Sequence, residues 1–245
     1  MRISHTYPYM KNDNENKLAD FDDSIVKEKA EQLTEKENSI EGKITKLFYY
    51  VRDDIKFGFV KKGDFMKASE TIRIQIGQCN NKTTLFLALC KALHIPARIH
   101  FSLIKKEIQK GIFPAWLFWL LPNQLSHSWL EVEVNGAWRK IDAYINDTIF
   151  YEHAKKILER KHWNIGYSMY RPKNATDPAD FDLSKERFEQ MGATTDDHGV
   201  WNDPMDYYMT SKYQNHPNMF TSLVYSLFLP YINQRIEKVR SDSLC

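Results

Sequence analysis

The chain has 245 residues, 42% hydrophobic and 27% charged, which is enough for one large globular domain. Its formal net charge of +2 gives no electrostatic case for nucleic acid as a partner. Three cysteines (Cys79, Cys90 and Cys245) without a Cys-x-x-Cys motif argue against a disulfide framework, so a reducing, cytoplasmic compartment is expected. We expect neither a secretory leader nor a membrane span, because the N-terminal residues lack an apolar core and no run reaches ~18 apolar residues.

Residues 1–20 are polar and predict an arm or a loosely packed strand. Two helices are expected next. The first spans residues 22–34, and the second starts at an Asn38 cap with Glu41 three residues later. The second helix carries its apolar residues at helical spacing, namely Ile44, Leu47, Phe48 and Val51.

Cys79 opens the most informative segment of the chain. Residues 71–76 predict a polar approach to it, and the apolar residues that follow Cys79 predict a central buried helix. A thiol in the first turn of a helix is close to unpaired backbone N–H groups and the positive end of the helix dipole, and both favour the thiolate. We therefore predict a nucleophile; the alternative is a buried structural thiol. Cys90, three turns further on, is expected in the core, and residues 98–104 predict a strand.

Residues 126–142 predict a β-hairpin whose turn is Asn135 and Gly136. Asn-Gly between runs of β-branched and aromatic residues favours a two-residue type I′ turn, which places Val134 opposite Ala137. Side chains alternate along each strand, so one face of the hairpin is apolar and must be core. The residues of this face are Leu130, Val132, Val134, Ile141 and Ala143.

The other face of the hairpin brings His127 and Asp142 together. In this register His127 lies opposite Tyr144 and is a diagonal neighbour of Asp142, roughly 7–8 Å away at the backbone. That separation is within reach of an imidazole–carboxylate hydrogen bond. The alternative for Asp142 is an ion pair with Arg139 or Lys140.

Cys79, His127 and Asp142 supply the nucleophile, base and orienting carboxylate that thiol acyl chemistry requires. The imidazole would take the thiol proton, and the sulfur would attack a carbonyl carbon to form a thioester. The backbone N–H of Cys79 is the first candidate for binding the oxyanion, with a second donor from Gln78 or Gln75. No cofactor is needed, and the remaining histidines lack tight metal-ligand spacing, so no metal site is expected.

Together these segments resemble the transglutaminase-like superfamily, a branch of the papain-like thiol enzymes, in its bacterial-type form. The motifs that carry the resemblance are Gly77-Gln78-Cys79, Ile95-Pro96-Ala97-Arg98, His127-Ser128-Trp129-Leu130-Glu131-Val132 and Trp138-Arg139-Lys140-Ile141-Asp142, with residues 50–57 upstream. The resemblance implies an α+β fold, with the nucleophile on a central helix packed on an antiparallel sheet that carries His127 and Asp142. The chain departs from the family pattern at His94, where glycine is usual, and at Ala143, where proline is common.

Residues 112–122 form an apolar and aromatic run bounded by proline, just ahead of His127. The plainest interpretation is an irregular segment folded over the core. A second is a wall of the substrate cleft, in which Trp116 and Trp119 would join Trp129 and Tyr144. Docking on a membrane surface is a third. Glu131, which lies opposite Lys140, is expected to form a surface ion pair of small energetic worth.

Beyond residue 147 the family pattern fades. The expected elements are a helix at 152–161, a loop at 172–182, a short helix at 184–191, a loop at 192–199 and a helix at 219–240 interrupted at Pro230. The last helix is apolar enough to pack on the core or on a second copy of the chain in a homodimer. One domain is expected overall, with an arm and helix at 1–38, a catalytic core at 39–150 and a helical extension at 151–245.

Two functions are compatible with these features. The first is a cysteine-dependent enzyme that acts on an amide or ester carbonyl as an amide hydrolase, peptidase or acyl transferase. Its substrate would be a peptide, a protein or a small acyl compound, and water is the default acceptor. The second is a catalytically silent fold of the same family that serves as a binding or assembly module. A fold hosts many functions, so the site itself has to decide.

Overall fold

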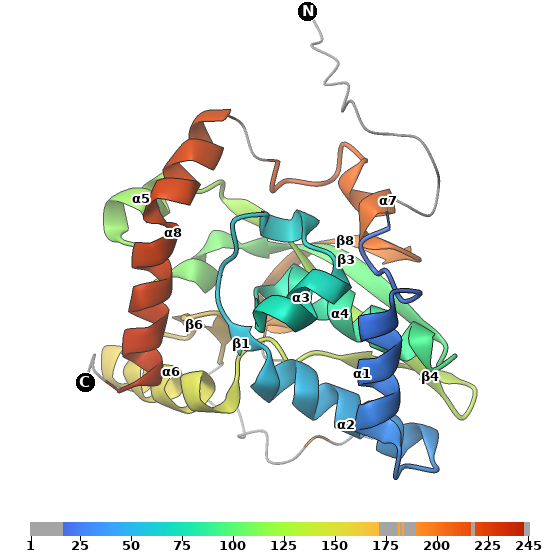
Figure 1. Cartoon of the computed structure of the whole chain (residues 1–245). Helices are drawn as coiled ribbons and strands as arrows, with labels where there is room; N and C mark the ends of the chain where they lie inside the picture. Colours follow the sequence, from blue (N-terminus) through green and yellow to red (C-terminus); the bar gives the residue numbers. More distant parts are fainter. Residues whose placement is uncertain (1–16, 172–180, 182, 184–189, 217–218, 243–245) are drawn as a thin grey trace, which may run out of the picture.

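The computed structural model describes residues 17–171, 181, 183, 190–216 and 219–242. Within them the α+β class is confirmed (Figure 1). The helices are α1 (Ser24–Thr34), α2 (Ile40–Tyr49), α3 (Ala68–Ile74), α4 (Cys79–Ala92), α5 (Ala115–Leu120), α6 (Thr148–Lys161), α7 (Pro204–Tyr208) and α8 (Met219–Arg240). The strands are β1 (Lys56–Phe57), β2 (Ile76–Gly77), β3 (Ala97–Lys105), β4 (Gln124–Val134), β5 (Ala137–Ile141), β6 (Ile165–Gly166), β7 (Met169–Tyr170) and β8 (Thr194–Trp201).

The central sheet is antiparallel and has the strand order β5-β4-β3-β8. Figure 1 shows α1, α2, α3 and α4 gathered beside this sheet, while α8 runs along the other end of the molecule next to α5 and α6. Strand β8 corrects the expected loop at 192–199. It is an edge strand in which no residue is fully buried, so it lacks the alternation of apolar and polar residues that marks a half-buried strand. Backbone pairing with β3 defines it instead.

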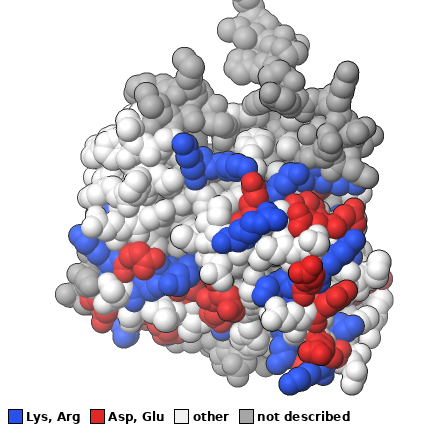
Figure 2. All heavy atoms as spheres, viewed as in Figure 1, with Lys and Arg blue, Asp and Glu red and all other residues white. Residues whose placement is uncertain are grey.

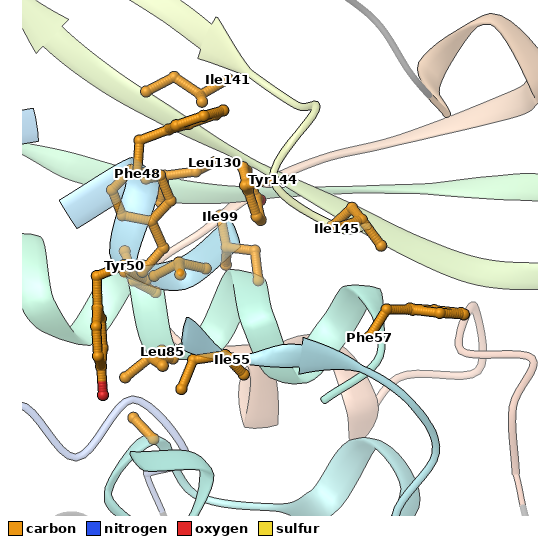
Figure 3. Packing of buried hydrophobic residues seen from close by; sticks show 14 of the residues in the cluster. Phe48, Tyr50, Ile55, Phe57, Leu85, Ile99, Leu130, Ile141, Tyr144 and Ile145 are labelled. Carbon is orange, nitrogen blue, oxygen red and sulfur yellow. The ribbon is translucent and has the colours of Figure 1, made fainter. Parts of the chain in front are cut away.

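Helix α4 is buried along most of its length, as expected for a central helix. Its apolar residues pack with side chains of β3, β4 and α2 in one core, and Cys90 belongs to that core as predicted. Figure 3 shows part of the cluster, with Leu85 of α4 below Ile99 and Leu130 of the sheet. Burying each such leucine or isoleucine contributes roughly 1.5–3 kcal/mol, so this contact fixes how α4 lies on the sheet.

The hairpin turn and register are confirmed. Asn135 and Gly136 have φ values of 53° and 75°, as a type I′ turn requires, and Val134 pairs with Ala137. The pairing ends at Leu130 and Ile141, so the expected extension to Asp142 and Tyr144 is wrong. The backbone explains the difference. Ala143 has a φ of 57°, which breaks the strand and which proline, with φ fixed near −65°, could not adopt.

Glu131 corrects a second expectation. It lies opposite Lys140, but its carboxylate is buried and contacts β3 rather than β5. One oxygen accepts from Arg98 Nε at 2.8 Å, and the other lies 2.7 Å from His100 Nδ1. His100 Nε2 in turn lies 2.6 Å from Asp197 of β8. The buried glutamate is therefore part of a polar cluster that links three strands of the sheet and reaches the surface at Asp197.

Local signals predicted most helix positions near the N-terminus. Helix α1 starts one residue after its Asp23 cap, and α2 starts after Ser39 rather than Asn38. Residues 71–76, which we expected as a polar approach to α4, contain the end of α3 and the first residue of β2. His94 has a φ of 56°, the geometry that glycine usually provides.

The C-terminal part packs on the core within the described residues. Helix α6 is confirmed, and α8 runs through Pro230 without the expected break. Ile232, Ile236 and Val239 of α8 are buried in the core cluster, which confirms packing on the core as its role. The loop expected at 172–182 and the helix expected at 184–191 fall almost wholly outside the described residues. No described helix has the length and apolar character needed to cross a membrane.

Candidate active site

Cys79 is the first residue of α4, as predicted, and its side chain is partly buried. The sulfur lies 3.7 Å from Asn80 Oδ1. Burial raises the pKa of the thiol well above its usual range, and the negative charges of Asp64 and Asp142 raise it further. Backbone N–H groups of Asn80 and Cys79 lower this pKa, but less. In this arrangement the balance favours the neutral thiol, against the expected influence of the helix N-terminus, which favours the thiolate.

The start of α4 meets β4 at the residues that flank His127. Strand β5 ends before this point, which leaves side chains to complete the edge of β4. Asn80 Nδ2 donates to the Ser126 carbonyl at 3.2 Å, and Ser128 Oγ donates to Asn80 Oδ1 at 2.8 Å. Thr83 Oγ1 donates to the Ser128 carbonyl at 3.3 Å. These contacts hold the nucleophile end of α4 at the level of His127.

His127 is fully buried, and neither ring nitrogen has a hydrogen-bond partner among the described residues. The predicted hydrogen bonds to Cys79 and Asp142 are therefore not formed in this arrangement. Burial lowers the pKa of the imidazole to about 3. The ring lies 6.3 Å, centroid to centroid, from Trp129, which itself stacks on His100. A neutral imidazole is nevertheless the form that can accept a proton.

Asp142 lies directly after β5 and is buried. Its Oδ2 accepts from the Gln190 backbone N–H at 2.8 Å. The negative charge of Asp142 raises the pKa values of Cys79 and Tyr144, so the carboxylate is close enough to act on both. Asp142 and Cys79 thus share one buried environment, whereas the bond from Asp142 to His127 is not made.

Comparison with known proteins supports the resemblance. Residues 27–143 match the family model of the transglutaminase-like superfamily, and this range contains Cys79, His127 and Asp142. The chain carries a transglutaminase-like core. No curated protein matches the chain.

Two solved structures are similar to the chain. One, from Cytophaga hutchinsonii and provisionally described as a cysteine protease, has 16% identity and a TM-score of 0.46, covering 82% of this chain and 52% of that one. The other, from Parabacteroides distasonis and provisionally described as a protease, has 14% identity and a TM-score of 0.36, covering 51% of this chain and 26% of that one. This chain therefore spans about half the length of the first structure.

Asp64 and Asn215 were not predicted, yet both adjoin the site of the transglutaminase-like core. Asp64 is buried, and it accepts from Gln78 Nε2, from the Tyr213 hydroxyl at 2.9 Å and from Asn215 Nδ2 at 2.9 Å. Asn215 also bonds to both backbone groups of Ser126, each at 2.9 Å. No local pattern could have revealed this link, because its partners are far apart in the sequence.

The two candidate oxyanion donors lie in different surroundings. Gln78 directly precedes Cys79, but its Nε2 donates to Asp64 and its backbone N–H donates to Asn81 Oδ1 at 3.2 Å. Gln75 is the exposed residue that ends α3, with a φ of 56°. The backbone N–H of Cys79 therefore stays the first candidate in the transglutaminase-like core.

The aromatic candidates for a cleft wall are not gathered in one place. Trp129 and Tyr144 are buried, and the Tyr144 hydroxyl lies 2.8 Å from Thr83 Oγ1. Trp116 and Trp119 are exposed on α5, which lies beside α8 in Figure 1. Part of the 112–122 run packs on the core as expected, because Ile112, Phe113 and Leu117 are buried. The expectation of an irregular segment is wrong, since residues 115–120 form α5.

Proposed function

We propose that the chain is a cysteine-dependent acyl enzyme that forms a thioester between Cys79 and the carbonyl carbon of an amide or ester. The observation that carries this proposal is the contact of α4 with both neighbours of His127, through Asn80. This contact supports the proposal because it links the thiol end of α4 to the segment of β4 that contains buried His127. The charge of Asp142, which acts on the thiol, adds support.

In the first step the Cys79 sulfur attacks the carbonyl carbon, while neutral His127 accepts the thiol proton. The backbone N–H of Cys79 donates to the oxyanion. When the intermediate collapses, the C–N or C–O bond breaks and His127 returns the proton to the leaving group. Water then attacks the thioester, which releases a carboxylic acid and restores the thiol. The imidazole has to rotate within hydrogen-bond reach of the sulfur for the first step to occur.

The carboxylates near the thiol are consistent with the order in which charged groups form in this mechanism. Asp64 and Asp142 disfavour a lone thiolate, since both are negative. Asp142 would stabilise the imidazolium that forms when His127 takes the proton, once the ring has rotated toward it. Asp142 is thus the candidate orienting group. We also infer a reducing, cytoplasmic compartment, in which Cys79 would stay a thiol.

Alkylation by iodoacetamide, mapped by peptide mass at pH 7, tests the proposal. We expect Cys79 to react in the wild type and the rate to fall by about 10²-fold or more in His127→Ala, because the base is lost. His216→Ala is the matched control, since His216 is exposed on the neighbouring segment, and buried Cys90 is an internal control. A Cys79 rate that is the same in all three proteins would favour the silent binding module instead.

A further inference from the structure

Helices α5 and α8 expose a strip of large apolar side chains. Their exposed fractions are 49% for Trp116, 77% for Trp119, 59% for Leu120, 67% for Leu227 and 45% for Tyr231. Single exposed apolar residues are common on protein surfaces, but a continuous group of them marks an interaction site. We call these five residues the α5–α8 strip.

The two helices of the α5–α8 strip are in contact with each other. Residues three or four apart share one face of a helix, so Trp116, Trp119 and Leu120 lie together on α5, as do Leu227 and Tyr231 on α8. The two helices meet where the rings of Trp116 and Phe228 pack edge to face, with centroids 4.8 Å apart. Figure 1 shows α5 beside α8, and Figure 2 shows a mainly uncharged surface over them.

The charges around the α5–α8 strip are mostly positive. The segments 105–125 and 219–240, which contain both helices, have six basic residues and two acidic residues. The basic residues are Lys105, Lys106, Lys110, Arg235, Lys238 and Arg240, and the acidic residues are Glu107 and Glu237. Lys106 lies at the strip itself, with Nζ 5.3 Å from the centroid of Phe118 and 5.9 Å from that of Trp119. The strip thus joins exposed aromatic rings to a cation at its edge.

We propose that the α5–α8 strip binds the surface of a membrane that contains anionic lipids. Trp and Tyr rings suit the headgroup region, where an apolar body and a polar edge are both accommodated. Leu120 and Leu227 would enter the boundary of the acyl chains, and Lys106 would contact lipid phosphate. The positive charge at the edge favours an anionic lipid surface over a second copy of the chain, because that copy would bring a like charge to the same edge. The proposal does not depend on the acyl chemistry of Cys79.

Co-sedimentation of the full chain with vesicles tests the proposal. We expect binding to vesicles of phosphatidylcholine with phosphatidylglycerol, weaker binding to phosphatidylcholine alone, and release by salt. Leu120→Ser should reduce binding about tenfold or more, since burial of one leucine is worth about that factor. Ile149→Ser is the matched control, because Ile149 is 58% exposed on α6, almost as much as Leu120. Lys106→Glu should remove the preference for the anionic vesicles.

Three results would overturn the proposal. The first is no binding to either vesicle, and the second is equal binding by wild type and Leu120→Ser. The third is a dimer in size-exclusion chromatography with light scattering that Trp119→Ser dissociates, without any vesicle binding. That last result would assign the α5–α8 strip to contact with a second copy of the chain.

Discussion

Burial is the main reason why Cys79 and His127 are both neutral. Burial acts on both, and for Cys79 the charges of Asp64 and Asp142 add to it. A buried imidazole without hydrogen bonds is costly, since each unpaired polar group typically costs ~1–3 kcal/mol. Such costs are tolerated where a group has a task that needs it unpaired, as a general base does. The burial of His127 and its lack of hydrogen bonds thus support a role as the base more than a structural role.

Replacing His127 with phenylalanine should change how stability depends on pH. The pKa of His127 is about 3 in the folded chain and ~6.5 in the unfolded chain, so between these values only the unfolded chain binds the proton. The wild type therefore loses stability as pH falls below ~6.5, by about 1.4 kcal/mol per pH unit, and His127→Phe should lack this loss. Urea unfolding at pH 7 and pH 5 measures it. Parallel pH profiles for the two proteins would show that His127 titrates normally.

Among the elements, strand β4 is the one on which the site depends. Residues 130–134 of β4 pair with β5 on the side away from β3. On the N-terminal side of Leu130 that edge of β4 is instead completed by the side chains of Asn80 and Asn215. A carboxamide can replace a neighbouring strand there, because it offers both N–H donors and a carbonyl acceptor. Asn215 thereby links β4 to Asp64 and keeps the segment after α7 against the site.

Asn215→Ala should loosen this edge. The change leaves the Ser126 N–H without its acceptor and removes one donor from buried Asp64, which should cost about 1–3 kcal/mol. Hydrogen exchange at the Ser126 amide should become faster, and Cys79 should become easier to alkylate. Gln214→Ala is the control, since that side chain is exposed and its backbone bond to Ser126 is kept. Equal exchange at Ser126 in both variants would show that Asn215 does not hold the edge.

Local sequence patterns predicted the elements whose structure is determined by residues close together in the sequence. The Asn135–Gly136 turn fixed the hairpin register, and the apolar periodicity after Cys79 predicted α4. Prediction failed where distant contacts decide. Glu131 is buried because β3 supplies its partners, and β8 forms because β3 offers an edge to pair with. Asp64 and Asn215 carry no local signal, since their partners are about 14 to 151 residues away.

In the whole molecule, α8 links the C-terminal part to the rest of the fold. Arg240 near its end donates to Asp147 through two nitrogens, at 3.0 and 2.6 Å, and to the Phe57 carbonyl at 2.9 Å. Both charged side chains are buried. Burial alone would raise the pKa of Asp147, but the bonds and charge of Arg240 lower it. The C-terminal part is thus integral to the fold.

Arg240→Met should destabilise the whole chain by about 3–5 kcal/mol, because it leaves Asp147 buried without its counter-charge. Lys238→Met, on the exposed face of the same turn, should change stability by no more than ~0.5 kcal/mol. Chemical denaturation followed by circular dichroism measures both. A loss in Arg240→Met as small as in the control would mean that water or a rearrangement compensates for the missing ion pair.

Formation of an acyl-enzyme on Cys79 with the help of His127 can be measured by mass spectrometry after brief reaction with p-nitrophenyl acetate and acid quenching. We expect one acetyl group on the peptide that contains Cys79 in the wild type. We expect none on this peptide in Cys79→Ala, and about 10²-fold slower formation in His127→Ala. Acetylation elsewhere in the chain, or the same rate on Cys79 with and without His127, would show that the two residues do not act as nucleophile and base.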